Sequence, residues 1–311
     1  MNGFSQVAVL GAGVIGASWT ALFLAAGCDV AVYDPVAGGE AYVRDYVRDA
    51  WPTLVELGLV KAQAPGTLSF HPTAAEAVRD ADFVQESVPE RIAVKHALYA
   101  EIEPALKPGA IVASSASGLK LGEMQAGWTD PSRFILGHPF NPPHLIPLVE
   151  VMGNARTADG VIAAAEAFYA GVGKVTIRVN REVPGHVANR LQAALWREAI
   201  HLVAIGAASV EDVDTAVWAG PGLRWAAMGP TMLFHLGGGP GGLAAFCEKY
   251  ADSFHRWWDD LGNPRLDEAT AAALVAGVEA ETRHGSQSDL SAKRDALITA
   301  MLRATAPLPR H

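Results

Sequence analysis

The sequence predicts an α/β protein, with a doubly wound sheet in its N-terminal part and helices alone in its C-terminal part. A short β-branched strand pattern at residues 6–10 runs into a glycine-rich turn and a helical stretch. Strand and helix patterns then alternate to about residue 181, as such a sheet requires. From about Val187 onward the strand patterns stop and long alanine-rich helical stretches follow. We therefore expect two domains, 1–185 and 186–311.

The first strand, turn and helix carry the most specific motif of the chain. Gly11, Gly13 and Gly16 have G-x-G-x-x-G spacing, and Asp34 ends the next strand pattern, 29–34. This is the fingerprint of a Rossmann-type dinucleotide site, in which the helix N-terminus receives the pyrophosphate. An acidic residue at that position binds ribose hydroxyls and repels a 2′-phosphate, so NAD is favoured over NADP. An ordinary strand–helix turn is the alternative. The residues expected at the cofactor are Gly11, Gly13, Val14, Ile15, Gly16 and Asp34.

The elements that follow continue the alternation. We expect helices at 38–58, 73–81 and 93–106, and strands at 68–70, 82–90, 110–117 and 133–140, with a last strand and linker at 174–185. Ligands bind such sheets at the carboxyl ends of the strands. Glu90, Ser117 and His138 all follow strand ends, so we expect them in one crevice beside the nicotinamide.

The stretch "GHPFNPPHLIPLVEV", residues 137–151, places His138 twelve residues before Glu150, with four prolines between them. Proline fixes φ and removes a donor, so we expect the segment to be neither a continuous helix nor a central strand. We expect a stiff loop that doubles back and brings Glu150 behind His138. An imidazole oriented by a carboxylate is suited to remove a hydroxyl proton. The other nine histidines are interpreted as structural.

Composition narrows the class of protein. The chain has 311 residues, of which half are apolar and 18% charged, the profile of a soluble globular protein. Its net charge is −9 with scattered arginines and lysines, which argues against a nucleic-acid partner. Cys28 and Cys247 fit no metal spacing and suggest reduced thiols in a cytoplasmic protein. The sequence shows neither a membrane-spanning run nor an export signal.

Taken together, five motifs resemble the L-3-hydroxyacyl-CoA dehydrogenase superfamily over almost the whole chain. They are "VLGAGVIGASWTALFLAAGCDVAVYD", "DFVQESVPERIAVK", "ASSASGLKL", "GHPFNPPHLIPLVEV" and "PGHVANRLQAALWREAIHLV". The resemblance implies a general base at His138, its orienting partner at Glu150, and substrate-oxygen contacts from Ser117 and Asn189. It also implies cofactor-ribose contacts at Glu90 and Lys95, Asn141 near the nicotinamide, and a homodimer formed by the helical domain.

Two departures from the superfamily bear on the substrate. The usual "SNTS" is "SSAS" here, so Ser115 and Ala116 replace an asparagine and a threonine while Ser117 is kept. The helical arm after the second strand is lysine-rich in members that act on acyl-CoA, but here its acids match its bases, and Lys61 is its only lysine. CoA phosphates would find little charge compensation there, so we expect a substrate other than an acyl-CoA.

The second domain resembles one branch of the superfamily, that of L-carnitine dehydrogenases and lambda-crystallin/L-gulonate 3-dehydrogenases, in "GPGLRWAAMGPTMLFHLGGGPGG", 220–242. Arg190 and Arg224 are candidates to anchor a free carboxylate, with a surface or capping arginine as the alternative. Five tryptophans suggest either a cation–π cage, with Trp225 among its candidates, or core and dimer-interface packing. They are Trp196, Trp218, Trp225, Trp257 and Trp258.

The sequence thus predicts an NAD-dependent dehydrogenase of a small free L-3-hydroxy acid resembling carnitine, gulonate or 3-hydroxybutyrate. Two alternatives stay open. The first is a dehydrogenase of L-3-hydroxyacyl-CoA thioesters. The second is a catalytically silent, crystallin-like NAD-binding protein, which the retained set of Ser117, His138, Glu150 and Asn189 argues against.

Overall fold

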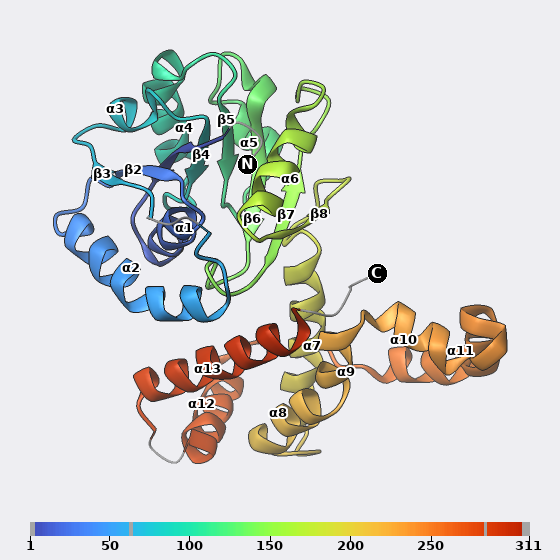
Figure 1. Ribbon diagram of the computed structural model, residues 1–311. Helices are drawn as coiled ribbons and strands as arrows, with labels where there is room; N and C mark the ends of the chain where they lie inside the picture. The colour runs from blue at the N-terminus through green and yellow to red at the C-terminus, as the bar shows by residue number, and fades with distance from the viewer. Residues whose placement is uncertain (1–3, 62–64, 283–284, 307–311) are drawn as a thin grey trace. The chain divides into compact units, whose positions relative to one another are not determined.

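A computed structural model describes residues 4–61, 65–282 and 285–306. The chain divides into two compact units, one made of residues 1–188 and 295–304 and the other of residues 189–294 and 305–311 (Figure 1). The first unit contains a mostly parallel sheet covered by helices, and the second is helical. The fold class predicted from the sequence is confirmed.

The first unit is built on one eight-stranded sheet in the order β3-β2-β1-β4-β5-β6-β7-β8. Its neighbouring strands are parallel except for β6 and β7, which run antiparallel. The strands are β1 (Gln6–Leu10), β2 (Asp29–Tyr33), β3 (Leu68–Phe70), β4 (Phe83–Glu86), β5 (Ile111–Ser114), β6 (Phe134–Pro139), β7 (Leu148–Met152) and β8 (Val175–Arg178). The sheet order reverses direction at β1 and β4, the point where Rossmann-type sheets bind dinucleotides.

Helices cover both faces of this sheet (Figure 1). One apolar core contains Trp19 and Phe23 of α1 (Val14–Ala25) and Phe168 of α6 (Val161–Gly171), and α2 (Gly39–Glu56) packs against it. The other core contains residues of α3 (Ala74–Val78), α4 (Ile92–Ile102) and α5 (Leu121–Gln125). Because both faces are buried, β4 and β5 consist of fully buried residues, as the apolar strand patterns predicted.

The proline-rich segment is a β-hairpin, which the sequence analysis did not predict. His138 was expected after the end of a strand but lies within β6, and residues 148–152 form β7, a strand between β6 and β8. The segment is not a continuous helix, as expected, but the expectation that it is not part of a central strand is wrong, because it contributes to β6 and β7, which both lie inside the sheet. Three of its prolines lie outside the strands, Pro142 and Pro143 in the connecting loop and Pro147 just before β7, and Pro139 is the last residue of β6, opposite Val149.

The described part of the second unit contains helices and no strand. They are α7 (Ala188–Ala204), α8 (Val210–Ala219), α9 (Pro221–Ala227), α10 (Pro230–Gly237), α11 (Gly242–Asp260), α12 (Glu268–Thr282) and α13 (Gln287–Thr305), with Ala188 of α7 and residues 295–304 of α13 counted in the first unit. Helices α10 and α11 stack through Phe234 and Phe246, whose ring centroids are 4.7 Å apart. Across the described residues, every helix is too short or too polar to cross a bilayer.

Candidate active site

The glycine-rich turn has the backbone geometry of a dinucleotide loop. Gly11 has a φ of +93°, and a Cβ there would lie 2.7 Å from the Ser87 carbonyl oxygen. A Cβ at Gly16 would lie 1.8 Å from the Gly11 carbonyl oxygen, so helix α1 packs closely on the turn. A Cβ at Gly13 would meet no atom within 4 Å, which leaves open space where a pyrophosphate approaches.

The residues around this turn fit an anionic dinucleotide. Gly13 is the N-cap of α1 and provides no side-chain cap, and the first turn contains no acidic residue. The first amides of the helix can therefore donate to an anion. Asp34, directly after β2, accepts hydrogen bonds from the backbone N–H groups of Ala12 (2.5 Å) and Val36 (2.7 Å). Its carboxylate thus lies at the edge of the same turn.

His138 and Glu150 are cross-strand partners in the antiparallel pair of β6 and β7. The Nδ1 atom of His138 lies 2.7 Å from Oε2 of Glu150. His138 is 5% exposed and Glu150 is fully buried. Because a carboxylate only accepts, Nδ1 carries the proton, and the Nε2 atom of the neutral ring is left as an acceptor. This is the tautomer that a general base requires.

The second oxygen of Glu150 is also hydrogen-bonded. Oε1 accepts the backbone N–H groups of Val187 (2.8 Å) and Ala188 (3.0 Å) at the start of α7. Burial alone would raise the pKa of Glu150, but the hydrogen bonds from His138, Ala188 and Val187 outweigh it and hold the pKa below 4.5. The carboxylate is therefore ionised and oriented before any ligand binds.

Glu90 and Ser117 come together as the sequence predicted. The Glu90 carboxylate accepts the backbone N–H groups of Ser117 and Gly118 and the Ser117 hydroxyl, which lies 3.0 Å away. Burial would raise the pKa of Glu90, whereas these bonds and Lys95 lower it overall. Both residues lie beyond the carboxyl ends of adjacent strands, β4 and β5.

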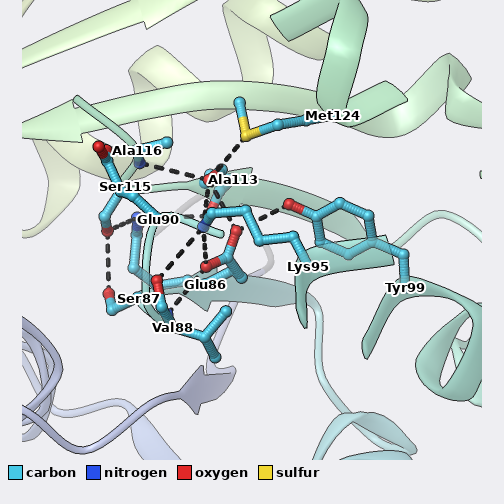
Figure 2. Close-up of polar contacts among 12 residues, drawn as sticks. Glu86, Ser87, Val88, Glu90, Lys95, Tyr99, Ala113, Ser115, Ala116 and Met124 are labelled. Atoms are coloured by element: carbon cyan, nitrogen blue, oxygen red, sulfur yellow. Dashed lines mark hydrogen bonds and ion pairs between the residues drawn. The ribbon is translucent and has the colours of Figure 1, made fainter. Parts of the chain in front are cut away.

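A fully buried polar network lies beneath these two loops (Figure 2). Glu86, the last residue of β4, accepts bonds from Lys95 Nζ (2.5 Å), Tyr99 Oη (2.9 Å), Ser114 Oγ (2.7 Å) and the backbone of Val88 (2.9 Å). Lys95 is 1% exposed, so its ammonium is used inside the unit to compensate Glu86. Its expected role as a ribose contact stays a prediction. In this position the Lys95 side chain supports the loop that carries Glu90.

The departure from "SNTS" has a structural account at Ser115. Its hydroxyl receives a hydrogen bond from Gln85 Nε2 (2.8 Å) and shares one with the Ser87 hydroxyl (2.9 Å). Gln85 in turn accepts a bond from Tyr169 (2.7 Å) and donates weakly to the Gly137 carbonyl, next to His138. Ser115 therefore links the two loops to the strand that carries the imidazole.

Buried contacts that the sequence analysis did not anticipate hold the loop 140–147. Lys174 donates to the backbone carbonyls of Pro143 and Ile146, and its Nζ lies 4.9 Å from the Trp19 ring centroid of α1. Burial lowers the pKa of Lys174 to about 7. The backbone N–H of His144 donates to the Ser18 hydroxyl of α1 (2.8 Å), and this hydroxyl also forms a hydrogen bond with Nδ1 of the His144 ring (2.8 Å). In the sequence Lys174 is an ordinary lysine before a strand, with no pattern that marks it.

The expected substrate residues of the second unit lie on its first helices. Asn189 and Arg190 are in α7, and Arg224 and Trp225 are in α9, so their roles at the site stay predictions. Asn141 is exposed in the loop 140–147 of the first unit, and its nicotinamide contact also stays a prediction.

Trp258 lines an apolar pocket of about 340 Å³ with Phe234, Phe246 and Phe254. Among ring contacts of the described residues, none joins Trp196, Trp218 or Trp225 to one another.

A dinucleotide turn and a buried imidazole–carboxylate pair across β6 and β7 fit an NAD-dependent oxidoreductase that acts on CH–OH groups, which is the class of the chain and its relatives. Two family models match the chain, "3-hydroxyacyl-CoA dehydrogenase, NAD binding domain" over residues 6–183 and "3-hydroxyacyl-CoA dehydrogenase, C-terminal domain" over residues 185–274. The chain belongs to the 3-hydroxyacyl-CoA dehydrogenase family. The family and the cofactor expected from the sequence are confirmed.

Relatives of known name are similar over nearly the full length. The chain is 48% identical over 303 residues to the L-carnitine dehydrogenase of Streptomyces coelicolor, covering 97% of this chain and 95% of the relative. It is 47% identical to that of Streptomyces griseus, covering 98% and 91%. Among solved structures, 5-formyl-3-hydroxy-2-methylpyridine 4-carboxylic acid 5-dehydrogenase, an NAD⁺-dependent dismutase, has a TM-score of 0.82 at 30% identity, covering 97% and 98%. FadB2 of M. tuberculosis has 0.66 at 30% identity, covering 89% and 94%.

Proposed function

We propose that this protein oxidises the 3-hydroxyl of a free L-3-hydroxy acid, with L-carnitine as the favoured substrate, to the 3-oxo acid. The observation that carries the proposal is the buried His138–Glu150 pair, placed by β6 and β7 at the carboxyl edge of a NAD-binding sheet. The names of the relatives, L-carnitine dehydrogenase at 48% and 47% identity, support the choice of substrate.

The charges on α2 support a free acid over a CoA thioester. Arg44 is paired with Glu40 at 2.7 Å, and Arg48 with Asp45 and Asp49 at 2.5 and 2.9 Å. Lys61, after the helix, donates to the Gly171 carbonyl at 2.5 Å. These cations already have acceptors on the protein, so CoA phosphates would have to compete for them. A carboxylic acid without CoA has no CoA phosphates and does not compete for these cations.

In the proposed reaction His138 is the general base. Glu150 holds Nδ1–H, so the lone pair of Nε2 accepts the proton of the substrate hydroxyl, and the buried carboxylate stabilises the imidazolium that forms. NAD, when bound, accepts the hydride from the carbon that carries this hydroxyl. Ser117 and Asn189 contact the substrate oxygen in this proposal. Glu90 holds the Ser117 loop through the backbone bonds described above.

The two ends of a carnitine-like substrate need opposite partners. For the carboxylate we propose Arg190 or Arg224, because a guanidinium binds a carboxylate through two parallel hydrogen bonds. For a quaternary ammonium the aromatic face of Trp225, beside Arg224 on α9, is the candidate. The 3-hydroxyl of such a substrate lies between its carboxylate and its ammonium group. Binding both ends would therefore fix the position of this hydroxyl for proton transfer to His138.

We also propose a cytoplasmic homodimer that assembles through the helical unit. Most of the large exposed apolar side chains belong to this unit, including Leu191, Trp196, Trp218 and Leu223. Large exposed apolar surface on a folded unit usually marks a protein interface. Among the described residues neither Cys28 nor Cys247 forms a disulfide, consistent with a reducing compartment.

The first test is NADH formation from NAD with a panel of L-carnitine, L-gulonate, L-3-hydroxybutyrate and L-3-hydroxybutyryl-CoA. We expect turnover of L-carnitine above the other free acids, and an inert thioester. D-carnitine is the matched control for the geometry at the hydroxyl-bearing carbon. Turnover of the thioester alone would overturn the substrate assignment while leaving the base in place. Tight NAD binding without turnover of any panel member would favour the catalytically silent alternative.

A further inference from the structure

A second imidazole lies against the proposed base. The ring centroid of His186 is 5.2 Å from that of His138, with an interplanar angle of 56°. His186 is 3% exposed, and its Nε2 lies 3.3 Å from the carbonyl oxygen of Ala116, the residue before Ser117. The side chain therefore touches both the base and the loop that carries the expected substrate contact. The sequence analysis interpreted this histidine as structural.

The backbone of His186 is unusual as well. Its φ is +49°, in the left-handed region, where residues other than glycine are uncommon. This turn precedes the two N–H groups, Val187 and Ala188, that bind Glu150. Glycine would adopt the same conformation without steric cost. A bulky ring at such a position points to a use for the side chain.

The hydrogen bonding fixes the protonation of the ring. A carbonyl oxygen only accepts, so Nε2 carries the hydrogen and donates it to Ala116. The Nδ1 atom is buried and has no partner among the described residues. A proton on it would leave a buried N–H unsatisfied beside the ring of His138. The stable form of His186 is consequently the neutral ring with a bare Nδ1.

We propose that His186 is a positioning residue of the active site, which ties the Ser117 loop to the His138–Glu150 pair. The proposal rests on the proposed function, since the pair is the base of that reaction. A neutral ring at this place lets His138 become an imidazolium during turnover without facing a second cation. The ionisable groups that face His186 are His138, Glu150 and Glu90. Burial first, and then the charge of His138, lower the pKa of His186 below 6.5 against the opposing effects of the Ala116 bond and the two glutamates.

Two substitutions distinguish the effect of the Nε2–H donor of His186 from the effect of its aromatic ring. His186→Phe keeps an aromatic ring but removes the Nε2–H donor, and His186→Gln places an amide N–H near the position of Nε2. We expect His186→Phe to lower kcat about tenfold or more while the Kd for NAD stays within about twofold. We expect His186→Gln to recover kcat to within about threefold of the wild type. His96→Phe is the matched control, because the His96 Nε2 also lies on a backbone carbonyl, that of Glu123 at 2.9 Å, away from His138. An unchanged kcat in His186→Phe, or an equal loss in both variants, would overturn the proposal.

A measurement without substrate keeps this proposal distinct from the proposed function. Nitrogen-15 NMR of the histidine-labelled wild-type protein should show His186 neutral at pH 7, with the proton on Nε2 and a titration midpoint below 6.5. His138→Gln should raise that midpoint, because the opposing charge is removed. A proton on Nδ1, or a midpoint that does not respond to His138→Gln, would contradict the proposal even if His186→Phe fails to fold. If no member of the hydroxy-acid panel is turned over but the NMR result is as expected, only the proposed function is contradicted.

Discussion

The hydrogen bond from His138 to Glu150 decides what the imidazole can do. With Nδ1 donating to the carboxylate at 2.7 Å, Nε2 is an acceptor at every pH at which the ring is neutral. The pair is buried, so water competes little for either group. The chemistry of the site therefore depends on two side chains whose geometry is set by strand pairing.

His138→Ala should lower kcat by a factor of about 10² to 10⁴, the usual reach of general-base catalysis. The Kd for NAD should change little, because the glycine turn and Asp34 are untouched. Stopped-flow turnover and calorimetric titration with NAD measure the two quantities separately. His96→Ala serves as the control histidine. Wild-type kcat in His138→Ala would remove the base from the proposed reaction.

Glu150 should make the free energy of unfolding depend on pH in the acid range. Its pKa is lowered in the folded protein, so between the folded value and 4.5 the unfolded chain binds more protons. The stabilisation from this carboxylate is complete above 4.5 and is lost as the pH falls through the folded pKa. Urea denaturation of Glu150→Gln and wild type should therefore give a difference in unfolding free energy that shrinks towards acid pH. A difference that grows as pH falls would contradict this sign.

Among the elements, the glycine turn and α1 form the proposed binding site of NAD. Gly13→Ala should weaken NAD binding about tenfold or more while the thermal midpoint stays near that of the wild type, because its Cβ enters open space that the pyrophosphate would need. Gly229→Ala is the matched control, since Gly229 also has open space and an ordinary negative φ of −61° at a helix N-cap. Equal NAD affinities of the two variants would argue against the placement of the dinucleotide.

The loop 140–147 depends on Lys174. Lys174→Met should remove the bonds to the Pro143 and Ile146 carbonyls and lower kcat by a factor of about 10 to 10², the cost of a small misplacement at a reacting centre. The loss of thermal stability should be small beside the loss of kcat, because the variant has a methionine in place of a buried amine. Lys61→Met, which loses an exposed lysine–carbonyl bond, is the control. Kinetic measurements give the change in kcat of each variant, and thermal denaturation gives its change in stability. A kcat equal to that of Lys61→Met would show that the loop needs no such anchor.

Local patterns predicted the elements well where the signal lies within one segment. The turn at Gly11–Gly16 and the strands ending near Glu90, Ser117 and His138 are in this class. Strand β7 was missed because its hydrogen-bond partners lie in β6 and β8, and the neighbouring prolines hide a short strand. Lys174 and His186 were missed because their roles come from burial and backbone angle, which no spacing records.

At the scale of the whole molecule, the exposed apolar side chains of the helical unit carry the proposal of a dimer. Sedimentation equilibrium should give about twice the chain mass of 32.7 kDa. Trp218→Glu, at a side chain that is 68% exposed, should shift the equilibrium to monomers. Ile92→Glu changes an exposed apolar residue of the sheet unit and should leave the mass unchanged. A monomeric wild type would contradict the proposed assembly.

Because His138 and Glu150 face each other across one antiparallel ladder, the proposed base and its partner lie in a single hairpin. Residues can be added to or removed from the connecting loop without changing which side chains pair. A one-residue insertion within β7 would instead turn Glu150 to the opposite face of the sheet and separate the pair completely. A change in the length of the connecting loop therefore leaves the pairing of the two side chains intact, whereas a change in the length of either strand does not.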